Sequence, residues 1–436
     1  MRYLVIQLAR FGDLVQTRRL VLSLLAEPGA EVHLCLDQSL AALAALLYPT
    51  ATLHPVTAHG TALAKLPPHE QAQALLSVNV PAFARLARCD FNRVYNLNFS
   101  PLNFRVASLF DPGLVRGHVW VNGQEAVGQW ARLAMRWSSM RRIGLNIADF
   151  WAWHYPAPVA PAEVNPPAQG RGGGLGVVLA GRESRRSLPA RELASLACAL
   201  LDTNTVRGDA PIVLLGSAAE AKAAHLLLRE LPPRRVGQVK NLCGGTDWQG
   251  LAEAVNGLDL LLTPDTGTMH LAAALGVPVL ATFLSSAWCA ETGPYGLGHR
   301  VLQAVTDCLP CLESQPCELG VACLRPFGDA RLTRYLATAD ARHLPEGLLD
   351  LDSSLDTLGQ TWTVRAGEDG SAALRADFRA FLARHLGTGG AWTAAGVRDF
   401  AERLYAERDW LVPDLESSHS RQCGACVVCF DDIQAY

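Results

Sequence analysis

LDLLLTPDTGTMHLAAALGVPVLATF, residues 258–283, is the stretch expected to decide the fold. Residues 258–263 are a short apolar run, which is typical of a parallel strand buried on both faces. Residues 264–267 interrupt this run, and residues 269–275 have the composition of a helix whose first turn begins at Gly267. The stretch therefore predicts a strand, a tight turn and a helix.

The turn of this stretch has the features of an anion site. Unpaired backbone N–H groups and the positive end of the helix dipole would stabilise an anionic ligand without a dedicated cation. Asp265 and Thr266 could cap the helix, and Gly267 would let a phosphate approach the backbone. His270 lies on the first helical turn, at the same mouth. For a DTG tripeptide alone, an ordinary capped crossover helix would be the simpler explanation.

Composition limits the class of protein. The chain has 436 residues, 50% of them hydrophobic, which predicts two domains with sizeable cores and an appendage. The formal net charge of −3 argues against nucleic-acid binding. No run has the length of a membrane-spanning helix, and residues 1–8 lack a signal-peptide pattern, so we expect a cytoplasmic protein. There, the 12 cysteines should mostly be thiols or metal ligands.

Residues 1–165 are expected to form a first α/β domain. Three apolar runs predict its strands: residues 2–8, 31–36 and 92–97. A helix is predicted at residues 14–25. The turn before it lacks a G-x-G-x-x-G motif, which argues against dinucleotide binding, but it carries Asp13 where open α/β sheets place functional groups. A purely structural role as a helix cap is the alternative.

Polar and basic residues follow in the same domain. Asn96, Asn98 and Arg105 could read the hydroxyls of a sugar acceptor, or could belong to a loop that satisfies its own backbone. Residues 130–142 have aromatic and apolar residues at helical spacing with arginines between them. We favour a helix that packs its aromatic residues on the sheet and leaves its arginines exposed to solvent. The alternative is a cationic face that contacts an anionic acceptor or a membrane surface.

Residues 166–330 are expected to form a second α/β domain after a Pro- and Gly-rich linker at residues 156–174. Its predicted strands are residues 175–180, 211–216, 236–242, 258–263 and 277–283, separated by helices at residues 190–202, 218–231 and 251–257. Such alternation predicts a doubly wound parallel sheet. Arg186 and Glu220 each follow a strand, and they suit phosphate oxygens and a ribose diol respectively. A solvated basic loop and a favourable helix N-terminus are the structural alternatives.

Three segments resemble glycosyltransferase family 9, the heptosyltransferase family: LVIQLARFGDLVQT at 4–17, GRESRRSLP at 181–189, and LLTPDTGTMHLAAALGVPVLATF at 261–283, with GPYG at 293–296. Members transfer a sugar from ADP-heptose or a related nucleotide sugar onto lipopolysaccharide cores or other acceptors. The resemblance implies the GT-B fold, in which two Rossmann-like domains face a cleft.

The resemblance also implies roles for single residues. Asp13 would be the general base that deprotonates the acceptor hydroxyl as it attacks the anomeric carbon with inversion. The donor would be bound by Gly12, Arg186, Glu220, Asp265, Thr266, Gly267 and His270. No catalytic metal is implied, so the glycine turn and basic residues would stabilise the leaving diphosphate.

The chain departs from the family pattern at three places. TRRL at residues 17–20 stands where relatives commonly have a proline, so Arg18 joins Asn96, Asn98 and Arg105 as a candidate acceptor contact. Arg186 stands where the family usually has lysine, which preserves charge but alters geometry. Residues 284–286 replace a GPT-like turn, which leaves the donor sugar open.

Clustered cysteines form two further motifs. Cys308, Cys311, Cys317 and Cys323 lie within 16 residues on a proline-containing loop, which fits a structural tetrahedral Zn or Fe site; a reduced thiol-rich loop or two disulfides are the alternatives. Some family members carry a similar cluster, and iron is implicated in some of them. Cys423, Cys426 and Cys429 form a second cluster with no obvious fourth ligand. Residues 331–436 are predicted to be mostly helical, notably at 376–386 and 397–410, with no assigned role.

The sequence thus predicts an inverting glycosyltransferase. Its donor would be a nucleotide-diphosphate sugar, ADP-heptose being favoured, and its acceptor a lipopolysaccharide core or another glycan, lipid-linked or protein acceptor. No cofactor would be required for catalysis. A peripheral contact with the inner membrane and the oligomeric state are left open. The alternatives are a nucleotide-sugar epimerase on the same fold, and a non-enzymatic metal- or redox-sensing protein that uses the cysteines.

Overall fold

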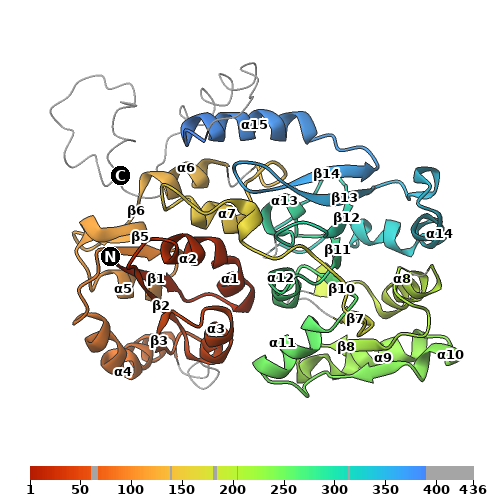
Figure 1. The fold of residues 1–436 in the computed structure, drawn as a ribbon, viewed down its shortest axis with the longest axis horizontal. Helices are drawn as coiled ribbons and strands as arrows, with labels where there is room; N and C mark the ends of the chain where they lie inside the picture. Colours follow the sequence, from red (N-terminus) through yellow and green to blue (C-terminus); the bar gives the residue numbers. More distant parts are fainter. Residues whose placement is uncertain (60–66, 138–139, 180–183, 204, 313–314, 389–436) are drawn as a thin grey trace. The chain divides into compact units, whose positions relative to one another are not determined.

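The computed structural model describes residues 1–59, 67–137, 140–179, 184–203, 205–312 and 315–388 (Figure 1). Within this part, the chain separates into two compact α/β units. The first comprises Met1–Ser139 and Phe150–Val159, and the second comprises Met140–Asp149 and the chain from Ala160 onward. The sequence predicted boundaries after residues 165 and 330, and did not predict that residues 140–149 belong to the second unit.

The first unit contains a six-stranded sheet in the order β3-β2-β1-β4-β5-β6. Its strands are β1 Arg2–Gln7, β2 Glu31–Asp37, β3 Thr52–Val56, β4 Arg93–Asn96, β5 Val115–Val121 and β6 Gln124–Val127. All neighbouring pairs are parallel except β5 with β6. The predicted strands at residues 2–8, 31–36 and 92–97 are confirmed as β1, β2 and β4. The short β3 contains a proline and a histidine, which hid it from a search for apolar runs.

Helices of the first unit connect these strands. They are α1 Phe11–Gln16, α2 Arg18–Leu25, α3 Ala41–Leu47, α4 Pro68–Leu86, α5 Pro101–Ala107 and α6 Gln129–Trp137. The helix α7 Ile147–Ala152 contains the point, between Asp149 and Phe150, at which the chain returns from the second unit to the first. The helix predicted at residues 14–25 is two helices that meet at Thr17, whose hydroxyl donates to the Asp13 carbonyl at 2.8 Å. No helix in the described part of the chain combines the length and apolar character needed to cross a bilayer.

The second unit contains an eight-stranded sheet in the order β14-β13-β12-β11-β10-β7-β8-β9. Its strands are β7 Leu175–Val178, β8 Ile212–Leu215, β9 Val239–Asn241, β10 Leu260–Pro264, β11 Val279–Phe283, β12 Arg300–Ala304, β13 Leu348–Leu355 and β14 Gln360–Ala366. The strands β7 to β12 pair in parallel, which confirms the predicted doubly wound sheet. The strands β13 and β14 extend it antiparallel and were not predicted within the mostly helical residues 331–436.

Helices cover both faces of this second sheet. They are α8 Ala190–Asp202, α9 Ala221–Glu230, α10 Pro233–Val236, α11 Trp248–Asn256, α12 Gly267–Ala274, α13 Cys289–Thr292, α14 Ala330–Thr338 and α15 Ala372–His385. Side chains of β10 alternate between two cores: Leu260 and Leu262 pack with α8, α9 and α14, and Leu261 packs with α11 and α12. Burial on both faces explains the unbroken apolar run of this strand.

Asp149 fastens residues 140–149 to the second unit. Its fully buried carboxylate accepts hydrogen bonds from the Tyr295 hydroxyl at 2.6 Å and from the Gln360 backbone N–H at 2.7 Å. Gly359 lies against the carboxylate, where an added Cβ would be 2.0 Å from Asp149 Cγ. The segment that enters the second unit from the first is therefore part of its packed core.

Asp149→Ala should lower the free energy of unfolding by about 3 kcal/mol, because it leaves the Tyr295 hydroxyl and the Gln360 N–H buried without an acceptor. Urea unfolding followed by tryptophan fluorescence measures the change. Asp209→Ala is the control, since Asp209 pairs with Arg207 at 2.8 Å with both side chains more than 70% exposed. Such a surface pair should contribute less than about 1 kcal/mol. Equal stability of the two variants would contradict the structural role of Asp149.

Candidate donor-binding site

The DTG turn lies between β10 and α12, as the sequence predicts. Thr266 is the N-cap of α12, and its hydroxyl accepts the Met269 backbone N–H at 3.3 Å. Thr263, on β10, places its own hydroxyl 3.1 Å from that of Thr266. Residues 265–268 are partly exposed, whereas the helix is buried from Met269 to Ala274. The positive end of a buried helix is therefore accessible at this turn, which favours anion binding.

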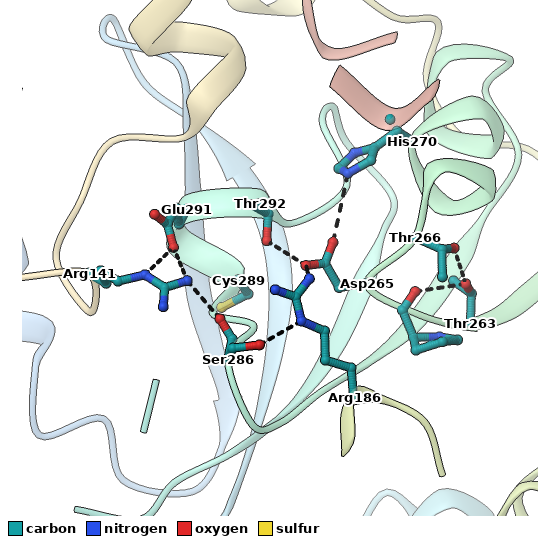
Figure 2. Close-up of polar contacts among 12 residues, drawn as sticks. Arg141, Arg186, Thr263, Asp265, Thr266, His270, Ser286, Cys289, Glu291 and Thr292 are labelled. Atoms are coloured by element: carbon teal, nitrogen blue, oxygen red, sulfur yellow. Dashed lines mark hydrogen bonds and ion pairs between the residues drawn. The ribbon is translucent and has the colours of Figure 1, made fainter. Parts of the chain in front are cut away.

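Asp265 does not cap the helix but is the centre of a polar network (Figure 2). Its Oδ2 accepts from Arg186 Nη1 at 3.3 Å and from the Thr292 hydroxyl at 3.1 Å. Arg186 lies on the short 3-10 turn Ser184–Arg186 after β7, and its Nε donates to the Ser286 hydroxyl at 2.7 Å. The structure thus brings Arg186 and Asp265 together, at the ends of the neighbouring strands β7 and β10.

His270 completes the network on the other side of Asp265. Its Nε2 lies 3.8 Å from Asp265 Oδ1, on the first turn of α12. Burial lowers the pKa of His270 to about 3, so the imidazole is neutral near pH 7. This contact is therefore not an ion pair. An anion here would meet the charge of Arg186 and the partial positive charge at the N-terminus of α12.

Glu220 lies at the same sheet edge, because it follows β8, which pairs with β7. One carboxylate oxygen accepts the Ser217 backbone N–H at 2.6 Å at the start of the helical segment that leads into α9. Glu220 thus stabilises a helix N-terminus, which is the structural alternative that the sequence analysis gave for this residue. A carboxylate has further acceptor positions, so the contact is compatible with a ribose diol on the other oxygen.

Asp13 lies on the first turn of α1, next to Gly12, after the end of β1 in the first unit. Its Oδ2 accepts the Arg10 backbone N–H at 3.0 Å, which is a structural contact at the helix start. Burial raises the pKa of Asp13 to about 6, and the nearby His59 opposes the rise. The imidazole of His59 itself lies 2.7 Å from the Leu8 carbonyl oxygen. The carboxylate is thus a stronger base than an exposed aspartate, while it still ionises at neutral pH.

The candidate acceptor residues occupy different environments. Asn96 is fully buried, and its amide bonds to Asn103 and to the His118 carbonyl. Asn96 therefore uses its hydrogen-bonding groups within the protein, and its contact with an acceptor stays a prediction. Asn98 is half-buried and accepts the Leu8 N–H at 3.2 Å.

The two basic candidates lie on helices of the first unit. Arg18 begins α2 and donates to the Leu47 carbonyl at 3.4 Å, at the end of α3. Arg105 is exposed in the last turn of α5. Of the acceptor candidates, Asn98, Arg18 and Arg105 keep some exposure and stay predictions.

The predicted metal site at the four clustered thiols stays a prediction. Among the described residues, no three His, Cys, Asp or Glu side chains are placed to hold a metal ion. Cys308 and Cys311 contact the hydroxyls of Thr306 and Ser285, each at 3.3 Å. Cys317 accepts the Val321 N–H at 3.3 Å, which lowers its pKa, and burial raises the pKa of Cys323. Three of the four sulfurs thus also make local contacts with a hydroxyl or a backbone N–H.

Some predicted features lie outside the described residues. They are Arg182 of the GRESRRSLP segment, the helix at residues 397–410, and the second cysteine cluster Cys423, Cys426 and Cys429.

Known proteins resemble this chain in sequence and in fold. The family model of glycosyltransferase family 9 (heptosyltransferase) matches residues 182–321, which include Arg186, the DTG turn and three of the four clustered cysteines. No curated protein sequence matches the chain. Among solved structures, the glycosyl transferase family 9 protein of Veillonella parvula has a TM-score of 0.53 and 16% identity, over 70% of this chain and 88% of its own.

Two E. coli enzymes are similarly close in fold. ADP-heptose LPS heptosyltransferase II has a TM-score of 0.51 at 18% identity, over 70% of this chain and 91% of its own. The heptosyltransferase WaaC, solved with ADP, has a TM-score of 0.51 at 15% identity, over 70% of this chain and 94% of its own. Residues 182–321 therefore match the model of glycosyltransferase family 9, the heptosyltransferase family, and the chain has the GT-B class of fold found in solved heptosyltransferases.

Proposed function

We propose that the chain is an inverting glycosyltransferase that moves a heptose-like sugar from a nucleotide diphosphate, with ADP-heptose as the favoured donor, to an acceptor hydroxyl. One observation carries the proposal: Arg186, held by Asp265 at 3.3 Å, lies beside the partly exposed N-terminus of α12, inside the segment that matches family 9. A guanidinium and free helix N–H groups together suit a diphosphate.

The donor would lie along the ends of β10, β7 and β8. The diphosphate would take hydrogen bonds from the first N–H groups of α12, where Gly267 has no side chain to block its approach. Arg186 would neutralise part of its charge, and Glu220 would accept hydrogen bonds from the ribose. The choice of ADP is supported by relatives on the same fold whose names or bound ligand include it.

Asp13 would act as the general base. The oxygen of the acceptor hydroxyl attacks the anomeric carbon, its proton passes to the Asp13 carboxylate, and the bond from the anomeric carbon to the diphosphate oxygen breaks. The departing nucleotide diphosphate carries the bonding electrons, and attack from the opposite face inverts the anomeric configuration. A pKa of about 6 lets Asp13 be ionised at neutral pH yet basic enough to take a proton. The proposed acceptor is a glycan such as a lipopolysaccharide core.

Chelation should leave transfer unchanged, because the proposed site stabilises the leaving diphosphate with Arg186 and the N–H groups of α12. The initial rate of transfer in the presence of about 1 mM EDTA should match the rate without EDTA to within about twofold. A large loss that Mg²⁺ restores would show that a divalent cation carries this charge instead.

Turnover of nucleotide sugars tests the proposal. The full-length protein is incubated with ADP-, GDP- and UDP-sugars, with and without lipopolysaccharide-core acceptor, and nucleotide diphosphate and sugar products are quantified. A transferase releases nucleotide diphosphate in equal amount to the sugar transferred, and only with acceptor present. Conversion of the donor sugar without acceptor would indicate an epimerase. If the protein neither converts nor binds any of these nucleotide sugars, both the transferase and the epimerase hypotheses are contradicted. The metal- or redox-sensing protein would then remain.

A further inference from the structure

We infer that Arg141 is a positioning residue of the donor site, which holds the guanidinium of Arg186 in place through Ser286. The inference rests on the proposed function and deepens it. Arg141 belongs to residues 140–149, the segment of the second unit that precedes residues 150–159 of the first. The donor site would thus depend on a residue 45 positions before Arg186 in the chain, outside the segment that matches family 9.

Arg141 fastens the turn that carries Ser286. Its Nη2 donates to the Ser286 carbonyl at 2.7 Å, and its Nη1 donates to the Cys311 carbonyl at 3.4 Å. The same Ser286 presents its hydroxyl to Arg186 Nε at 2.7 Å. Figure 2 shows Ser286 between the two arginines, bonded to one through its backbone and to the other through its side chain. Movement of the Ser286 backbone would therefore move an acceptor of Arg186.

The Ser286 turn is not fixed by its own sequence alone. Ser285 adopts a left-handed conformation with φ of +59°, which is uncommon for a residue other than glycine. Its carbonyl accepts the Cys311 N–H at 3.1 Å, and its hydroxyl lies 3.3 Å from Cys311 Sγ. A strained turn keeps its shape only where its surroundings hold it. Arg141 contacts both sides of this arrangement, at Ser286 and at Cys311.

A second arm of the network starts from the same guanidinium. Arg141 Nε and Nη2 contact Glu291 Oε2 at 2.7 and 2.6 Å. Glu291 lies on α13, next to Thr292, whose hydroxyl donates to Asp265 at 3.1 Å. Arg141 thus supports Arg186 through Ser286, and supports the partner of Arg186 through α13. This closed ring of contacts is drawn in Figure 2.

Arg142 provides a matched control. Its guanidinium donates to the carbonyls of Leu309 and Thr306 at 2.7 and 2.6 Å, and it lies over the Trp288 ring. Its hydrogen bonds therefore anchor the chain at the cysteine loop with the same charge. Its guanidinium bonds neither Ser286 nor Glu291, although Trp288 comes directly before α13. Loss of Arg142 should loosen the loop without misplacing Arg186.

The test is a double-mutant cycle read by ADP binding. ADP is titrated into wild-type protein, Arg141→Gln, Ser286→Ala and the double variant by calorimetry. We expect each single change to weaken ADP binding about tenfold, and the double variant to lose clearly less than the two single losses combined, because both changes act in part on the same contact of Arg186. Arg142→Gln should lower the melting temperature yet keep the ADP Kd within about twofold of wild type.

Turnover separates positioning from general loss of structure. At saturating donor, Arg141→Gln should keep kcat within about threefold of wild type while the KM for donor rises about tenfold, since the reacting groups are unchanged. The inference is overturned if Arg141→Gln binds ADP like wild type, if its loss equals that of Arg142→Gln, or if the two single effects add fully. If wild-type protein binds neither ADP, GDP nor UDP, the proposed function itself fails, and the inference with it.

Discussion

Asp13→Asn should lower kcat by about a thousandfold, the scale of effect typical of a lost general base. Asparagine keeps the shape of the side chain and can still accept the Arg10 N–H, so the helix start should be preserved. Donor binding should be unchanged, because the proposed contacts of the diphosphate lie in the second unit. The measurement is kcat and KM for nucleotide release with saturating acceptor. Asp90→Asn, at an exposed carboxylate of the same unit, is the control and should keep wild-type turnover.

The pH profile gives this prediction a second readout. For wild-type protein, kcat/KM should fall as pH drops through about 6, where Asp13 becomes protonated, and Asp13→Asn should lose this pH dependence.

The free energy of unfolding should change in the opposite direction to activity in this pH range. The pKa of Asp13 is higher in the folded protein than in the unfolded chain, so ionisation of Asp13 costs stability as pH rises through this range. Asp13→Asn should therefore be at least as stable as wild type at pH 7. A variant that keeps half of wild-type turnover would refute the role of Asp13.

Arg186→Ala should weaken ADP binding about a hundredfold, since it removes a charge-assisted donor and leaves Asp265 without its cation beside the incoming diphosphate. Calorimetric titration with ADP measures the loss. The ADP affinity of Arg186→Lys should lie between those of wild type and Arg186→Ala. Lysine keeps the charge but cannot reproduce the planar guanidinium that bonds Ser286 and Asp265 together.

Arg185 supplies the control for this substitution, one residue away on the same 3-10 turn. Arg185→Ala removes the same charge from the same surface, so a purely long-range effect of charge would weaken ADP binding equally in both variants. We expect Arg185→Ala to stay within about threefold of wild type. Equal losses in the two variants would show that Arg186 makes no specific contact with the nucleotide.

The core of the donor site could be predicted from local sequence. A strand buried on both faces must be apolar throughout, and a helix needs a cap, so residues 258–275 identified β10, the turn and α12. Thr266 caps the helix as expected. Arg186 and Glu220 were predicted to lie at one edge because they follow strands of one parallel sheet, and their donor contacts stay predictions.

Other features depend on contacts between distant parts of the chain. The aromatic and apolar residues of 130–142 have helical spacing, with arginines between them, but α6 ends at Trp137. Arg141 reaches Ser286 across 145 positions. No periodicity in the sequence indicates that contact. The strands β13 and β14 were missed for a related reason. Asp350 interrupts the apolar run of β13, and it is tolerated in the core because Arg300 bonds both of its oxygens, at 2.7 and 2.5 Å.

Two predictions from residue type alone show what local pattern leaves out. Asn96 has the chemistry to read a sugar, but burial and its bonds to Asn103 and the His118 carbonyl use that chemistry inside the first unit. The cysteine loop has the spacing of a metal site, but Cys317 bonds to the Val321 N–H four residues further on. In both places the structure shows a hydrogen bond to a neighbouring backbone or amide group, which residue type and spacing do not indicate.

A crystal structure of the protein with bound ADP would show whether the proposed donor site holds the nucleotide. We expect the β-phosphate within hydrogen-bond distance of the first backbone N–H groups of α12 and of the Arg186 guanidinium, with the ribose next to Glu220. An ADP molecule bound elsewhere on the chain, with Arg186 still directed only at Asp265 and Ser286, would contradict it.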